Sequence, residues 1–217
     1  MPKAQIKAKP ELKVIREEGI PHLLVPGEMG AVLELTVKDK DGRVTDHRLM
    51  RSKSFVRQFL ELLWIQAYQV PELICMDVRD TSNVVQDICE SGYTFAANAG
   101  DTDDTFGPIV GTGTTAPTID GYAIETKIAH GVGAEDLQYG TVTWGAPTSD
   151  ATTSQFTITR DFANASGGAI TVNEVALYVK AWDDGHYFMI IRDKITGGIA
   201  VPNGQTLTVN YREQAVV

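Results

Sequence analysis

Few side chains in this sequence stand at spacings that are typical of a reactive site. Residues 111–113 read Gly-Thr-Gly, but neither the later glycine of a dinucleotide loop nor the Gly-Lys-Ser/Thr ending of a phosphate loop follows. Asp101, Asp103 and Asp104 offer oxygen ligands at close spacing, yet a calcium loop of the helix-loop-helix type also needs a central glycine and a distal glutamate. We therefore predict no nucleotide site, and at most an adventitious cation at the aspartates.

The histidines and cysteines form no pattern of ligands or nucleophiles. None of the four histidines lies four residues from another, as in a helical zinc motif: His22, His47, His130 and His186. The spacing of Cys75 and Cys89 matches neither paired metal ligands nor a disulfide framework, and we interpret both as reduced, buried thiols. No Gly-x-Ser-x-Gly elbow is present. We predict no catalytic residue, metal or cofactor, although a triad built from distant residues stays open.

Three aromatic side chains near predicted turns or strand ends are candidates for surface contacts: Tyr139, Trp144 and Trp182. An exposed ring at such a place can stack on a sugar or contact another subunit. The alternative interpretation is that these rings belong to the core and rim of an ordinary β-sandwich.

Charge is distributed unevenly along the 217 residues, whose formal net charge is −9. Residues 1–70 hold twelve Lys/Arg and nine Asp/Glu, net +3, and residues 71–217 hold seven and nineteen, net −12. An acidic body repels polyphosphate, which argues against direct nucleic-acid binding. The basic side chains near the start are either solvated or candidate contacts with an acidic neighbouring subunit: Lys3, Lys7, Lys9, Lys13 and Arg16.

No run approaches the ~20 apolar residues that a membrane-spanning helix needs. Residues 1–18 mix charged and apolar side chains instead of forming the core of a signal peptide. We therefore expect a protein that is made in cytoplasm and has no membrane partner.

The elements that would position these residues are mainly strands. Three prolines interrupt residues 1–28, which we interpret as an N-terminal arm, and residues 29–217 as one β-rich domain. Residues 31–50 alternate in polarity around Asp41-Gly42 and predict a β-hairpin. Residues 54–69 carry a wide apolar stripe behind Ser54, a candidate cap, and predict one amphipathic helix.

Beyond Pro71 the sequence is typical of antiparallel strands. Runs rich in β-branched and aromatic residues alternate with turn clusters such as Gly167-Gly168 and Asn203-Gly204. We predict a mainly β fold, an antiparallel β-sandwich of the jelly-roll kind. The polar, small-residue stretch 91–118 is predicted to be a surface loop that makes contacts.

Residues 109–128 read IVGTGTTAPTIDGYAIETKI and residues 170–178 read ITVNEVALY. Together these two segments resemble a recurring pattern in structural proteins of tailed phages and related proviruses. In that family a G-T-G-T-T-A-P turn precedes a D-x-x-L helix start, and an I-T-E-x-G-L-Y-like strand follows. The resemblance covers residues 106–217, and Ala176 stands where the family usually has glycine. It implies a virion protein of the capsid surface or tail, with copies of itself and major capsid or tail proteins as partners.

We therefore expect a non-enzymatic virion structural protein of a tailed virus, which assembles as a homo-oligomer on the capsid or in the tail. Such a protein needs complementary contact surface under closed symmetry and no reactive pocket. The first alternative is a glycan- or receptor-binding module at a fibre tip, with Trp144 and Trp182 as stacking platforms. The second is a hydrolase on a β scaffold, whose site is built from distant His, Asp and Glu residues.

Overall fold

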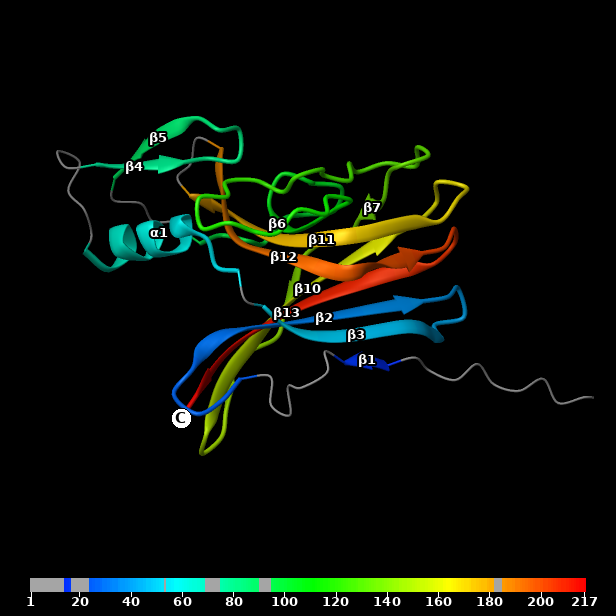
Figure 1. Ribbon diagram of the computed structural model, residues 1–217, viewed down its shortest axis with the longest axis horizontal. Coiled ribbons are helices and arrows are strands. Elements are labelled where there is room, and N and C mark those ends of the chain that lie inside the picture. Colours follow the sequence, from blue (N-terminus) through cyan, green and yellow to red (C-terminus); the bar gives the residue numbers. More distant parts are fainter. Residues whose placement is uncertain (1–13, 17–23, 53, 69–74, 90–94, 182–184) are drawn as a thin grey trace, which may run out of the picture.

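The computed structural model describes residues 14–16, 24–52, 54–68, 75–89, 95–181 and 185–217. Most of these residues lie in strands, and the described part forms one eight-stranded, one three-stranded and one two-stranded sheet (Figure 1). The prediction of a mainly β, antiparallel sandwich is confirmed. Most of the predicted arm, residues 1–28, lies outside the described residues.

The eight-stranded sheet, called here the large sheet, has the order β1-β3-β2-β13-β10, and three short strands pair along the outer edge of β10. Its strands are β1 (Val14–Arg16), β2 (Met29–Lys38), β3 (Val44–Ser52), β7 (Gln138–Tyr139), β8 (Thr143–Trp144), β9 (Thr148–Ser149), β10 (Thr153–Ala163) and β13 (Thr206–Val216). All pairs are antiparallel except β1 with β3. The predicted hairpin 31–50 is confirmed as β2–β3, which is slightly longer. In its turn Gly42 has φ 76°, and the Asp39 carboxylate accepts the backbone N–H groups of Asp41 and Arg43.

The three-stranded sheet, the small sheet, has the order β12-β11-β6, with strands β12 (His186–Val201), β11 (Ile170–Ala181) and β6 (Gly107–Gly111). Strand β6 is buried along its whole length, so the prediction of a surface loop over 91–118 is wrong there. The reason is non-local, because β6 pairs with β11, more than sixty residues later. Irregular chain after β6 buries Ile124 and Ile128 in the core.

The core lies between the large and the small sheet. Leu33 and Leu35 of β2, Val209 of β13 and Phe162 of β10 are fully buried on the inner face of the large sheet. Leu33 and Leu35 are two positions apart on β2, and Leu207, Val209 and Tyr211 repeat the same spacing on β13. This is the spacing of a strand with one face in the core. Val175 of β11 belongs to the same core cluster.

Helix α1 (Arg57–Tyr68) lies at one end of the sandwich, beside the two-stranded sheet of β4 (Met76–Arg79) and β5 (Val85–Ile88) (Figure 1). The predicted helix 54–69 is confirmed, but it begins later than Ser54. The residues before it bond to the edge of β12 instead, since Val56 N–H donates to Ile190 O at 3.1 Å and Arg192 N–H donates to Ser54 O at 3.1 Å.

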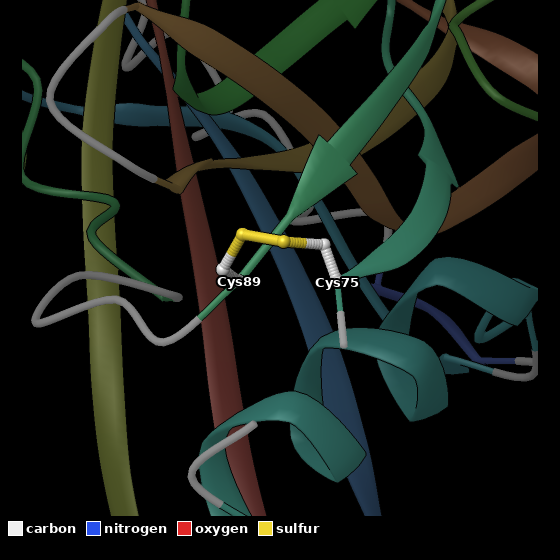
Figure 2. The surroundings of a disulfide bond; sticks show 2 residues. All are labelled: Cys75 and Cys89. Atoms are coloured by element: carbon white, nitrogen blue, oxygen red, sulfur yellow. A yellow bond between two sulfur atoms is a disulfide. The ribbon is translucent and has the colours of Figure 1, made fainter. Parts of the chain in front are cut away.

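The two cysteines form a disulfide, so the prediction of two reduced thiols is wrong (Figure 2). Met76 and Ile88 are opposite each other in the β4–β5 pair. Cys75 precedes Met76 and Cys89 follows Ile88, so the two cysteines lie at the open end of the pair, with Cα atoms 4.4 Å apart. Directly facing residues of an antiparallel pair reach this separation. The sequence shows a strand before Cys89, but not the partner strand that starts at Met76.

Candidate functional site

An apolar groove of about 560 Å³ opens between α1 and the large sheet. We call this pocket the apolar groove. The start of β2, the start of β10 and the end of β13 extend beyond β11 and β12 (Figure 1). The walls of the groove include Phe59, Leu60 and Leu63 of α1, Met29 of β2, and Phe156 of β10.

The groove leaves large apolar side chains in contact with solvent. Met29 is 73% exposed, Leu60 65% and Trp144 45%. The Trp144 ring stacks on Phe156 across the β8–β10 pair, with centroids 5.9 Å apart and planes 23° apart. Contiguous apolar surface of this kind is typical of a place where another molecule binds.

Among the described residues that line the groove, Glu213 is the one with a charged side chain. It follows Leu207, Val209 and Tyr211 in the inward-facing row of β13. No described residue donates a hydrogen bond to its carboxylate or forms an ion pair with it. Burial and, second, the nearby Asp193 raise the pKa of Glu213 to about 7. The groove therefore combines an apolar wall with one acid that lacks a cation.

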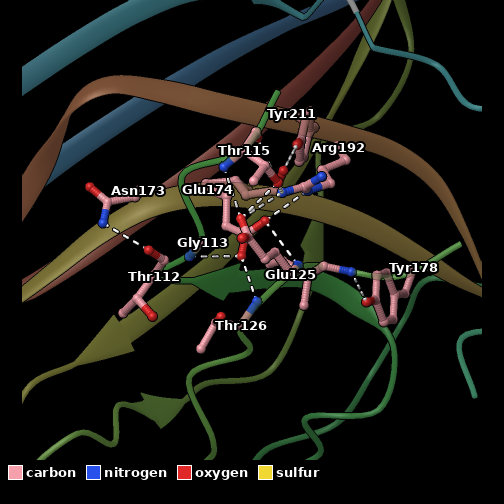
Figure 3. A network of polar contacts seen from close by, with 12 residues as sticks. Thr112, Gly113, Thr115, Glu125, Thr126, Asn173, Glu174, Tyr178, Arg192 and Tyr211 are labelled. Carbon is pink, nitrogen blue, oxygen red and sulfur yellow. Dashed lines mark hydrogen bonds and ion pairs between the residues drawn. The ribbon is translucent and has the colours of Figure 1, made fainter. Parts of the chain in front are cut away.

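Apart from the groove, a cluster of polar side chains holds the irregular chain after β6 on the small sheet (Figure 3). Its centre is Glu174 of β11, which is fully buried. One carboxylate oxygen accepts the N–H groups of Gly113 and Thr126, both at 2.9 Å. The other accepts the Glu125 N–H at 3.1 Å and pairs with Arg192 Nε at 2.7 Å. Three backbone N–H groups and one arginine thus bind the two oxygens of this carboxylate.

The outer part of the same cluster involves Thr115 and Glu125. The Glu125 carboxylate accepts the N–H and the hydroxyl of Thr115, both at 2.8 Å, and these contacts hold the pKa of Glu125 below its ordinary value. Arg192 lies 3.5 Å from the same carboxylate. Farther along β11, the Tyr178 hydroxyl accepts the Ile124 N–H at 2.6 Å. Residues 112–126, called here the Gly-Thr-rich loop, are therefore fastened at several points.

Close packing requires glycine at two positions here, Gly111 at the end of β6 and Gly113 in the loop. A Cβ at Gly111 would lie 2.5 Å from Thr126 O and 2.7 Å from a Glu174 carboxylate oxygen. A Cβ at Gly113 would meet the same carboxylate. The Gly-Thr-Gly run is thus explained by the approach of Glu174 to the backbone.

Arg160 of β10 is fully buried and fastens a second stretch of irregular chain. Its guanidinium donates to the carbonyl oxygens of Gly140 at 2.8 Å, Phe106 at 2.9 Å and Pro108 at 3.3 Å. Further contacts reach the carbonyl oxygens of Gly100 and Asp103. The arginine therefore links β10 to the chain that leads into β6.

Tyr139 is 1% exposed, so the prediction that it is a surface aromatic is wrong. Strand β7 pairs with the end of β10 and places the Tyr139 ring edge-on to Phe162, with centroids 4.8 Å apart. The Arg160 guanidinium lies 4.8 Å from the ring centre, and the hydroxyl donates to Ile128 O at 2.7 Å. Its polar group thus finds a partner inside the protein.

The other predicted contact residues are placed as follows. Trp144 lies at the surface, on the rim of the apolar groove. Arg16 is described only through the backbone of β1. The remaining candidates lie outside the described residues: Lys3, Lys7, Lys9, Lys13 and Trp182.

The structure does not bring the described histidines together. His47 bonds Glu34 at 2.8 Å on the β2–β3 hairpin, whereas His130 accepts the Tyr139 N–H at 3.0 Å beside β7. Asp104 accepts the His130 N–H at 2.9 Å and so serves the same loop. No group of three potential metal ligands occurs in the described part of the chain. No helix among the described residues is long and apolar enough to cross a membrane.

Sequence reasoning missed the groove and Glu213, although the sequence carries a signal for the acid. Leu207, Val209, Tyr211 and Glu213 occupy alternate positions of one strand, so a carboxylate closes an otherwise inward-facing row. No family model, no curated protein and no solved structure matches this chain.

Proposed function

We propose that this chain is a non-enzymatic structural protein that assembles with copies of itself in the virion of a tailed virus, on the capsid or in the tail. The observation that carries the proposal is the apolar groove with its exposed rim residues Met29, Leu60 and Trp144. Exposed apolar surface favours association, because its burial against another protein removes it from water.

The buried polar groups support the same proposal. Glu174, Arg192 and Arg160 contact backbone groups of irregular segments, and these contacts fix the segments on the sandwich. A rigid outer layer is what docking by shape requires, since ordering on binding would weaken the association.

The disulfide between Cys75 and Cys89 also fits a virion component. Disulfides persist on virion surfaces and in other oxidising environments, and they are rare in proteins that stay in the cytosol. A protein made in the host cytoplasm would close this bond when the particle leaves the cell.

Sedimentation of the purified chain over a range of concentrations tests the proposal. We expect the wild type to be oligomeric and to co-sediment with capsid or tail proteins. Leu60→Glu should shift the equilibrium to monomer, because burying one leucine stabilises an interface by about 1.5–3 kcal/mol, tenfold or more in dissociation constant. Val84→Glu is the matched control, since Val84 is exposed on the β4–β5 turn and does not line the groove. A wild type that remains monomeric and binds no particle protein contradicts the proposal.

One observation favours a glycan-binding function instead. The Trp144 ring is about half exposed and backed by Phe156, as a stacking platform for a sugar would be. Saturable binding on a glycan array that Trp144→Ala abolishes, together with an unchanged oligomeric state, would select this alternative.

A further inference from the structure

The apolar groove suits a narrow chain segment that carries small apolar side chains and a positive charge. Its walls come from α1, from the ends of β2, β10 and β13, and from residues of β8, β11 and β12. Met29 and Leu60 of this lining are exposed to solvent. Glu213 lies in this wall with no described cation near its carboxylate. Since a carboxylate in apolar surroundings is unfavourable unless it is paired, an occupant with an ammonium group would stabilise its charged form.

Residues 1–13 of this chain carry both apolar side chains and positive charges. In an extended segment Ala4, Ile6 and Ala8 would lie on one side, and the intervening positions on the other. Residues 1–13 hold four lysines and one glutamate, net +3, whereas residues 14–217 hold fifteen Lys/Arg and twenty-seven Asp/Glu, net −12. Opposite net charges steer such a segment toward the body of a neighbour.

The direction of β1 favours the groove of a second copy over that of the same copy. β1 runs parallel to β3, with Val14 opposite His47 and Arg16 opposite Leu49. β3 continues to Ser52, which pairs with Ala31 beside the groove-lining Gly30. The direction of β1 at Val14 therefore leads away from the groove of the same copy. To reach that groove, the preceding chain would have to turn back and cover the five residue steps from His47 to Ser52, about 17 Å.

We infer that residues 1–13 of one copy lie in the apolar groove of a neighbouring copy, with Ile6 against Phe59 and Phe156 and a lysine ammonium beside Glu213. This inference rests on the proposed assembly function and names the segment and the surface through which copies join. Thirteen extended residues span at most about 45 Å, so the neighbour must lie within that reach of Val14.

Cross-linking of the full chain tests the inference directly. A photo-reactive benzoyl-phenylalanine replaces Ile6, and equal amounts of this protein in ¹⁴N form and of the wild type in ¹⁵N form are mixed and irradiated. We expect peptides with one ¹⁴N and one ¹⁵N partner that join position 6 to Phe59, Phe156 or Trp144. Cross-links within one copy, or cross-links to another surface, overturn the inference.

Two variants of the full chain supply an independent readout. Glu213→Gln, and the joint replacement of Lys3, Lys7, Lys9 and Lys13 by Gln, should each weaken self-association about tenfold. The matched control is Glu135→Gln, an exposed acid that does not line the groove. If the oligomer forms and neither variant weakens it, the arm is not the occupant and the assembly function stands. If the wild type is monomeric at every concentration, both proposals fail.

Discussion

Replacement of Glu174 tests how the Gly-Thr-rich loop is held on the sandwich. One carboxylate oxygen accepts the N–H groups of Gly113 and Thr126, and the other accepts the Glu125 N–H and pairs with Arg192. In Glu174→Gln one of these oxygens becomes an NH₂ group, which is a donor. Whichever way the amide is oriented, the NH₂ group faces two donors, so two contacts are lost.

The size of the effect follows from these contacts. A hydrogen bond to a charged group contributes about 1.5–3 kcal/mol, and leaving one partner of a buried ion pair uncompensated costs about 3–5 kcal/mol. The 3.5 Å contact of Arg192 with Glu125 offsets part of this loss. We expect Glu174→Gln to lower the free energy of unfolding by about 3–5 kcal/mol, a large share of the 5–15 kcal/mol of a typical domain.

Guanidinium denaturation followed by tryptophan fluorescence and circular dichroism measures this change. Glu125→Gln is the matched control, and it should lower the stability much less because Glu125 is at the surface. A double-mutant cycle with Arg192→Met should be non-additive, since removal of both partners leaves no unpaired buried charge. A loss below about 1 kcal/mol for Glu174→Gln, or strict additivity in the cycle, would refute the reasoning.

Three further changes test other parts of the structure by the same denaturation or by thermal melting. Arg160→Met should lower the free energy of unfolding by about 3 kcal/mol or more, because buried carbonyl oxygens lose their donor, whereas the exposed Arg43→Met should have no measurable effect. Gly111→Ala should lower the Tm by about 4 °C or more through overpacking, and Gly100→Ala, with open space around its Cβ, should leave the Tm unchanged. Burial raises the pKa of Glu213 from 4.5 to about 7, so between these pH values the folded monomer binds more protons than the unfolded chain. Its stability should therefore fall by roughly 2–3 kcal/mol as the pH rises from 4.5 to 7, and Glu213→Gln should remove that fall.

The local elements could be predicted from the sequence. The β2–β3 hairpin follows from alternation around Asp41-Gly42, and α1 from a continuous apolar stripe. Both patterns act over a few residues, so the physics that forms the element is visible in the sequence. The start of α1 was misplaced because residues 54–56 bond to β12, which lies far away in the chain.

Long-range pairings could not be predicted. Strand β6 is five residues long, and its burial depends on β11. Tyr139 is buried because β7 joins the edge of β10 and Arg160 covers its ring. The groove has the same kind of origin, since α1, the large sheet and the small sheet all contribute to its walls. Each of these features depends on contacts between segments that no local pattern connects.

Residues 109–128 and residues 170–178 are parts of one physical unit. Gly111 and Gly113 have no room for a Cβ because the Glu174 side chain approaches their backbone. The Glu174 carboxylate can be buried because it accepts the Gly113 N–H and pairs with Arg192. A chain that has one segment therefore needs the other to fold in this way. The pairing of the two segments is explained by how the loop is fastened to the sheet. The contacts that we propose between copies involve parts outside this unit, namely the apolar groove and residues 1–13.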